Sequence, residues 1–352
     1  MNSAVRNSTL DMVKGLALLL VVVGHSWFAA SSAEMYRVIF SIHMPFFFFV
    51  SGMVLNASRS FYRFAFIRAD SLLKPYFVVL AILLLIRTAK SGMNFSGPEF
   101  AARFGGIFWG TGASIQWVPL WFLTHLFLAS VICWLLIRLA RQSQAVLLIF
   151  AATLFSLGAW AANSTAFSTV GYEVFPVSGL PWSADLLPLS ISFMLFGYFA
   201  RAPFLAFHHS AVTFILAGSV FILLHLAFDD TIDFNLRAMG NPLVVLAQIA
   251  AGIYLMFSIG SIIASGRVGA RIPRFLLALN QAAIFVLIFH LFFMDKTLSL
   301  LTSHRIPGLL AAGLSVAAGI GFPVLLSLAA KQVKLARWLM LPSVRAPAKA
   351  KA

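Results

Sequence analysis

Long apolar stretches, separated by short clusters of polar and charged residues, occupy most of the chain. About 20 apolar residues in an α-helix are enough to cross a hydrocarbon core of about 30 Å. The pattern predicts ten such helices, at residues 10–29, 36–57, 72–89, 119–138, 145–162, 187–201, 211–228, 242–264, 275–294 and 307–330. We therefore predict an all-α polytopic membrane protein.

The segments between these helices contain no internal repeat and no soluble domain. Two connections are long, residues 90–118 and 163–186, and their Gly, Pro and Trp residues favour ordered loops. We predict one membrane domain over residues 1–335 and a basic, disordered cytoplasmic tail over residues 336–352. The first 30 residues could instead be a cleaved secretory signal, but the later spans and Asp11 favour a retained first helix.

Charge changes this picture by giving the helices a direction. Only 10% of residues are charged and 61% are hydrophobic, which excludes an ordinary soluble domain. With the N-terminus inside, one side receives 18 of the 25 Lys and Arg residues and two of the ten acids. Positively charged loops stay in the cytoplasm, so both termini are predicted to be cytoplasmic. The net charge of +15 is then explained by topology and lipid contact, and we expect no nucleic-acid partner.

The first predicted helix carries two polar residues that need an explanation, Lys14 and His25. Eleven residues make three turns plus about 20°, so both lie on one face, about 16 Å apart along the axis. Ionisable side chains inside a membrane are costly and are functional hypotheses by default. Lys14 could instead be a snorkelling anchor paired with Asp11, and a neighbouring helix could satisfy a neutral His25.

Histidines at similar depth connect helices that are distant in sequence. Five are predicted in the outer half of the membrane: His25, His43, His125, His225 and His290. One or two of them could simply form hydrogen bonds between helices. No span has an acid at mid-depth, which argues against a proton- or sodium-coupled carrier. No metal-ligand spacing, GxSxG elbow or P-loop is present, and the lone Cys133 excludes an internal disulfide.

A cation at the cytoplasmic mouth and a histidine above it suit a reaction that spans the bilayer. Lys14 and cytoplasmic arginines could hold an anionic group, while His25 takes a proton from an attacking hydroxyl.

Four stretches of the chain resemble the acyltransferase 3 family of integral membrane acyltransferases, especially its fucose 4-O-acetylase-like branch. They are "LDMVKGLALLLVVVGHS" (10–26), "IFSIHMPFFFFVSGMVL" (39–55), "FIRADSLLKPYFV" (66–78) and "LWFLTHLF" (120–127). The resemblance implies ten helices in one membrane domain. It also implies O-acylation of a carbohydrate, with acetyl-CoA reached from the cytoplasm.

Carried over residue by residue, the resemblance makes His25 the catalytic base and Lys14 its basic partner, with Asp11 orienting or pairing with Lys14. The other candidate site residues, for substrate or donor binding, are His43, Ser51, Arg68, Lys74, Tyr76, Trp121, His125 and His290. Two positions depart from the family pattern. Lysine replaces the usual arginine at 14, and Ser71 stands where a second arginine normally follows Arg68.

These observations predict a multi-pass O-acyltransferase of the bacterial inner membrane. The donor would be acetyl-CoA or another acyl-CoA, without a permanently bound cofactor, and no metal site is expected. The acceptor would be a sugar hydroxyl of a polysaccharide or lipid-linked glycan, acylated directly or through an acyl-histidine. A lipid-linked sugar flippase or exporter, and a structural membrane protein whose histidines only bridge helices, are the alternatives.

Overall fold

The computed structural model describes residues 7–91, 97–141, 143–163 and 179–343, and all structural statements concern these residues. They form two compact units. Unit 1 combines Met1–Phe47 with Ala200–Ala329, and unit 2 combines Phe48–Phe199 with Ala330–Ala352. Each unit is therefore built from two separate stretches of chain.

Unit 1 is helical apart from one short antiparallel pair of strands, β1 (Ile232–Asp233) and β2 (Ala238–Met239). Its helices are α1 (Ser8–Gly24), α2 (Trp27–Ala30), α3 (Ala33–Phe40), α11 (Arg201–Leu205), α12 (Ala211–Ala227), α13 (Pro242–Ala264), α14 (Arg271–Gln281) and α15 (Ala283–Ser303). Two helices begin in unit 1 and end in unit 2, namely α4 (His43–Met53) and α16 (Gly308–Gln332).

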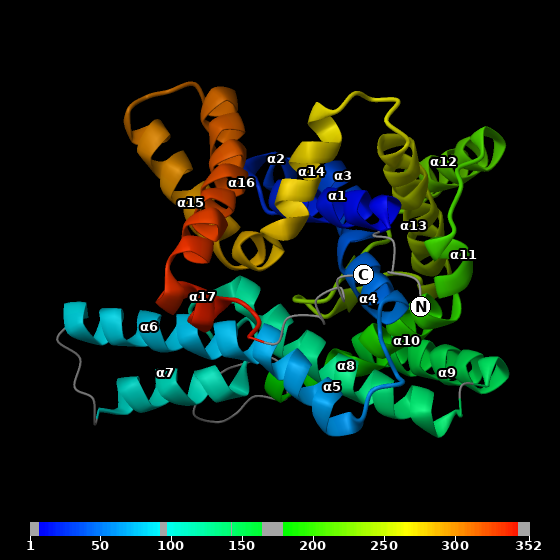
Figure 1. Ribbon diagram of the computed structural model, residues 1–352. Coiled ribbons are helices and arrows are strands. Elements are labelled where there is room, and N and C mark those ends of the chain that lie inside the picture. Colours follow the sequence, from blue (N-terminus) through cyan, green and yellow to red (C-terminus); the bar gives the residue numbers. More distant parts are fainter. Residues whose placement is uncertain (1–6, 92–96, 142, 164–178, 344–352) are drawn as a thin grey trace, which may run out of the picture. The chain divides into compact units, whose positions relative to one another are not determined.

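Within its described residues, unit 2 consists of helices joined by turns and loops, without a β-strand. Its remaining α-helices are α5 (Phe61–Arg68), α6 (Lys74–Ser91), α7 (Pro98–Trp109), α8 (Trp121–Leu139), α9 (Gln144–Asn163), α10 (Leu187–Phe199) and α17 (Lys334–Met340). A π-helical turn, Ala69–Leu73, joins α5 to α6, and 3-10 turns occur at Val118–Leu120 and Pro181–Leu186. Helices α6 and α7 run alongside each other within this unit (Figure 1).

The prediction of an all-α polytopic membrane protein is confirmed. Among the described residues, eight helical segments are long and apolar enough to cross a membrane, and each overlaps one of the ten predicted spans. The other two predicted spans coincide with α1 and α12, which have 17 residues each, or about 26 Å of helix. The cytoplasmic location of both termini stays a prediction.

Several segments differ from the sequence-based boundaries. The span predicted at 275–294 is divided, because α14 ends at Gln281 and α15 continues from Ala283 to Ser303. The loop predicted at 90–118 contains α7, which starts at Pro98, a residue favoured in the first helical turn. Of the predicted loop at 163–186, residues 164–178 lie outside the described residues. Helix α17 covers the start of the predicted tail, and residues 344–352 also lie outside.

Small residues bring the helices of unit 1 into close contact around α1. A Cβ on Gly15 would lie 2.5 Å from the carbonyl oxygen of Leu276 in α14. A Cβ on Gly260 of α13 would lie 2.3 Å from the Val13 side chain. Since lipid tails are as apolar as leucine, membrane helices depend on such close packing rather than on the hydrophobic effect. Helix α1 is therefore held against α13 and α14.

In unit 2, close packing at small residues also joins α4 to α10. A Cβ on Gly52 would come within 1.9 Å of the Met194 carbonyl oxygen. A Cβ on Gly197 would come equally close, 1.9 Å, to the carbonyl oxygen of Phe49. The backbones of α4 and α10 touch at both points. Gly52, in the Ser51-Gly52 pair of the stretch 39–55, therefore has a packing role.

We expect Gly52→Ala and Gly197→Ala each to destabilise the protein by about 1–3 kcal/mol, because the added methyl group meets backbone and cannot be relieved by a side-chain rotation. Thermal unfolding of the purified protein would measure the loss. Gly105→Ala is the matched control, since Gly105 lies in α7 with nothing near its Cβ position. Equal melting temperatures for all three variants would contradict the close-contact interpretation.

Candidate active site

Three histidines from three different helices meet in unit 1. The ring centroid of His25, at the end of α1, lies 5.3 Å from that of His290 in α15. It lies 6.1 Å from the ring of His43, the first residue of α4. Both pairs are arranged edge to face, at 76° and 87°. Three of the histidines singled out in the sequence therefore form one group, which we call the histidine cluster.

A hydrogen bond to the backbone determines which nitrogen of each ring carries the proton. The Nδ1 of His25 lies 2.8 Å from the Val21 carbonyl oxygen, and His43 and His290 make the same bond to the carbonyl four residues earlier. A carbonyl oxygen can only accept, so Nδ1 is the donor in each case. In the neutral imidazole the other nitrogen, Nε2, then has a free lone pair and can act as a base.

Burial separates the three rings. His43 and His290 are only 3% and 1% exposed, whereas His25 is exposed. The Nε2 of His290 is buried and has no hydrogen-bond partner among the described residues. Leaving a buried polar atom unpaired is costly, so such an atom calls for a functional explanation. His25 is thus the accessible member of the cluster, backed by two buried imidazoles.

Phe40 completes the surroundings of the cluster and was not singled out from the sequence. Its ring contacts His43, with centroids 4.5 Å apart, and His25, at 5.8 Å. Tyr36 stacks on Phe40 at 4.0 Å and donates a hydrogen bond to the buried carboxylate of Asp233, in β1. A chain of contacts therefore leads from the acidic loop before α13 to His25. In the sequence, only the spacing of Phe40, three residues before His43, could have indicated that Phe40 lies beside the cluster.

Asp11 has a partner that sequence reasoning missed. Its Oδ1 accepts a hydrogen bond of 2.9 Å from Nδ2 of Asn280, in α14. Gly15, one turn further along α1, is the residue against which α14 packs. The Asp-x-x-Lys-Gly element therefore docks α14 on α1. Lys14 is half-buried in the same segment, and its proposed role as basic partner of His25 stays a prediction.

The division of the ninth predicted span changes the position of His290. That span ended at residue 294, which placed His290 about one turn from the outer end. Helix α15 continues to Ser303, so His290 lies in its first half. His225 sits near the end of α12, where Nε2 is 3.1 Å from the Ser41 hydroxyl. It is a hydrogen-bonding partner between helices, as one interpretation of the histidines predicted.

His125 belongs to unit 2 and forms a separate polar group there. Its Nδ1 donates to the Trp182 carbonyl oxygen at 3.1 Å, so its Nε2, 2.5 Å from Oγ of Ser190, accepts from that hydroxyl. Both His125 and Ser190 are fully buried, and the Trp121 ring lies 5.7 Å from that of His125. The carbonyl belongs to a turn in which Trp182 adopts a φ of 56°. This group fastens α8 to α10 and to a strained turn.

Three residues predicted to bind substrate or donor, Arg68, Lys74 and Tyr76, lie at or near the π-helical turn of unit 2. Arg68 precedes the turn and lies over the Phe64 ring, and the buried Tyr76 donates to the Ile107 carbonyl oxygen at 2.6 Å. Lys74 Nζ donates to Asp70 (2.6 Å), to the carbonyl of Leu341 (2.7 Å) and to the Ser343 hydroxyl (3.0 Å). Asp70 also accepts from the backbone N–H of Ser343 at 2.5 Å.

Lys74 and Asp70 therefore hold the segment that follows α17. An ammonium group has three N–H donors, and Lys74 makes three such hydrogen bonds. Ser51 is half-buried on α4 beside Gly52. Within the described ranges, no group of three or more His, Cys, Asp and Glu residues is arranged to hold a metal ion.

Of three comparisons with known proteins, one gave a match. The family model described as an acyltransferase domain matches residues 7–328, which is nearly the whole chain. The searches of curated proteins and of solved structures returned no match.

We expect Asp11→Ala to destabilise the protein by about 1 kcal/mol, because Asn280 loses its acceptor. Asp11→Asn keeps an acceptor oxygen at this position and should be nearly neutral in thermal unfolding. A double-mutant cycle with Asn280→Ala measures the coupling directly. If both Asp11 variants lose the same stability and the cycle shows no coupling, the negative charge of Asp11, and not its contact with α14, is what matters.

Proposed function

The chain belongs to the acyltransferase 3 family, and we propose that it moves an acyl group from acyl-CoA to a sugar hydroxyl, with His25 as the general base. Membership of the family establishes a multi-pass membrane acyltransferase. The choice of base, donor and acceptor is our proposal. The observation that carries it is the position of His25, an exposed residue whose ring lies beside the buried imidazoles of His43 and His290.

A second histidine in the same chain shows why the surroundings of His25 matter. His304 also ends a helix, α15, and its Nδ1 makes the same 2.8 Å bond to the carbonyl four residues earlier. It too is exposed, yet its ring contacts no aromatic ring among the described residues. The backbone hydrogen bond is therefore a general property of these helices. What distinguishes His25 is the pair of buried imidazoles beside it.

In the proposed step, Nε2 of His25 removes the proton of a sugar hydroxyl. The hydroxyl oxygen attacks the carbonyl carbon of the thioester, and the carbon–sulfur bond breaks. The proton then passes from His25 to the departing sulfur, which leaves as the thiol of CoA. The products are an O-acyl sugar and free CoA, so atoms and charge balance without a metal or resident cofactor. His290 can accept a hydrogen bond through its unpaired Nε2, either from the bound hydroxyl or from protonated His25.

The donor is proposed to be acetyl-CoA or another acyl-CoA entering from the cytoplasm. Lys14 is the basic residue of unit 1 proposed to bind its phosphates. Arg68 and Lys74, in unit 2, are donor-binding candidates by the family resemblance alone. Because Lys74 holds Leu341 and Ser343, donor binding at Lys74 requires this segment to move or to share the ammonium group. The acceptor is proposed to be a polysaccharide or lipid-linked glycan at the bacterial inner membrane.

We expect His25→Gln to lower the rate of acyl transfer by about 100- to 10,000-fold, the usual contribution of a general base. Purified protein would be incubated with labelled acetyl-CoA and candidate polysaccharides, and CoA release and label transfer would be followed together. His304→Gln is the matched control, because it removes a histidine with the same backbone hydrogen bond and should leave the rate unchanged.

Two results would overturn this function. One is wild-type turnover by a well-expressed His25→Gln variant. The other is movement of a lipid-linked sugar across the membrane without any CoA release, the behaviour expected of a flippase or exporter.

We expect His290→Leu to lower turnover by about tenfold or more while leaving the melting temperature unchanged or higher. The substitution removes a buried atom that has no partner, so its structural cost is small. His43→Leu serves as the comparison from the same cluster. Should His290→Leu lose stability but keep its turnover once corrected for folded protein, His290 would be a packing residue only.

A further inference from the structure

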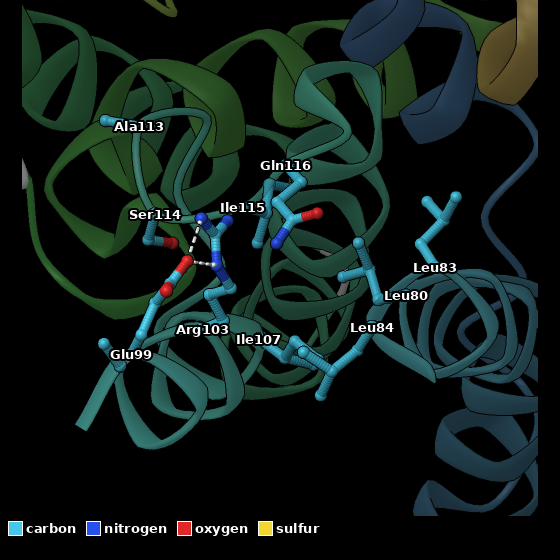
Figure 2. Close-up of a pocket in the computed structure, with 11 residues that line it drawn as sticks. Leu80, Leu83, Leu84, Glu99, Arg103, Ile107, Ala113, Ser114, Ile115 and Gln116 are labelled. Carbon is cyan, nitrogen blue, oxygen red and sulfur yellow. Dashed lines mark hydrogen bonds and ion pairs between the residues drawn. The ribbon is translucent and has the colours of Figure 1, made fainter. Parts of the chain in front are cut away.

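A cavity of about 310 Å³ lies between α6, α7 and the loop that precedes α8 in unit 2 (Figure 2). Its inner surface is apolar, with Leu80 and Leu84 from α6, Ile107 from α7 and Ile115 from the loop, all buried. A volume of this size is at the lower end of the range for small-molecule sites. No residue of the histidine cluster lines it.

The rim of the cavity is polar and charged. Arg103 donates two hydrogen bonds, from Nε and Nη2, to one carboxylate oxygen of Glu99, at 3.0 and 2.8 Å. Figure 2 shows this pair beside Ser114 and Gln116. Arg87, one turn beyond Leu84, donates to Oε1 of Gln116 at 3.3 Å. Two guanidinium groups therefore lie at the mouth of an apolar cavity.

Both helices that form the walls expose apolar side chains on their other faces. In α6, Ile82, Leu85 and Ile86 are 46%, 57% and 47% exposed, and in α7 Phe104 and Phe108 are 49% and 54% exposed. In a membrane protein such faces contact hydrocarbon. Both walls of the cavity therefore belong to helices that also present apolar side chains suited to contact with hydrocarbon.

The cations at this mouth are unusual for their predicted side of the membrane. Seven Lys and Arg residues are predicted to face outward, and three of them, Arg87, Lys90 and Arg103, lie within one short stretch. The positive-inside rule disfavours cations there, so topology does not explain them. Arginine is the side chain best suited to binding a phosphate through two parallel hydrogen bonds.

We propose that this cavity is a binding site for an amphiphile that carries a hydrocarbon chain and a phosphate headgroup. The chain occupies the space among Leu80, Leu84 and Ile115, and the phosphate binds Arg103, taking the place of the Glu99 carboxylate. Such a ligand has two sources, a phospholipid of the bilayer or a lipid-linked glycan. The cavity shares no residue with the proposed acyl-transfer step, and only the lipid-linked glycan source, which belongs to the proposed acceptor class, rests on the proposed function.

Binding of farnesyl phosphate to the full-length protein in phosphatidylcholine nanodiscs tests the site directly, with native mass spectrometry as the readout. Arg103→Gln should weaken binding by about tenfold or more, since it removes a charge-assisted phosphate contact. Leu84→Trp should abolish binding by filling the cavity. Glu99→Gln should tighten it, because the competing carboxylate is gone. Lys296→Gln, an exposed cation of α15, is the matched control and should bind as the wild type does.

The source of the ligand follows from competition. Displacement of farnesyl phosphate by a longer polyprenyl phosphate, but not by phosphatidylglycerol, indicates a lipid-linked glycan, and the reverse indicates a phospholipid. Either result supports the site. Equal binding of uncharged farnesol, or unchanged binding in both Arg103→Gln and Leu84→Trp, would overturn it. Ala113→Trp replaces Leu84→Trp if the latter fails to fold, because Ala113 lines the cavity from an exposed position.

Discussion

The hydrogen bond from Nδ1 to the carbonyl four residues earlier determines what His25, His43, His225 and His290 can do. Each helix already supplies that carbonyl, so a histidine can be placed at almost any depth with one nitrogen satisfied. What remains is Nε2, and its neighbours decide its role. In His225 it lies beside the Ser41 hydroxyl, and in His290 it stays unpaired in a buried position. The same Nδ1 hydrogen bond to the backbone is thus compatible with different roles for Nε2.

The first helix shows how function and packing can depend on the same few residues. Asp11 and Gly15 hold α14, Val13 contacts α13, and His25 closes the helix within the histidine cluster. Because α14 leads into α15 across a single residue, Ala282, the docking of α14 also influences where α15 starts. His290 is two turns into α15. The distance between His25 and His290 therefore depends on contacts made at the other end of α1.

Much of this architecture follows from hydropathy, because ten apolar segments of about 20 residues leave a membrane protein few alternatives. The sequence assigned five histidines to one depth, and packing brings three of them, His25, His43 and His290, together. The break at Ala282 was not indicated, because α14 and α15 are joined without Gly, Pro or a charged residue at the junction. Two further features depend on tertiary packing, which a hydropathy pattern does not predict. They are the π-helical turn at Ala69–Leu73 and the buried contact of His125 with Ser190.

The discontinuity of unit 1 has a consequence for biosynthesis. His25 and His43 are inserted with the first helices, but their partner His290 emerges only after nearly all of unit 2 has been translated. At about 5–20 residues per second, the ribosome takes on the order of ten seconds or more to cover that interval. The growing chain therefore carries an incomplete cluster throughout most of its synthesis. Assembly of the candidate site is one of the last events in the membrane insertion of this protein.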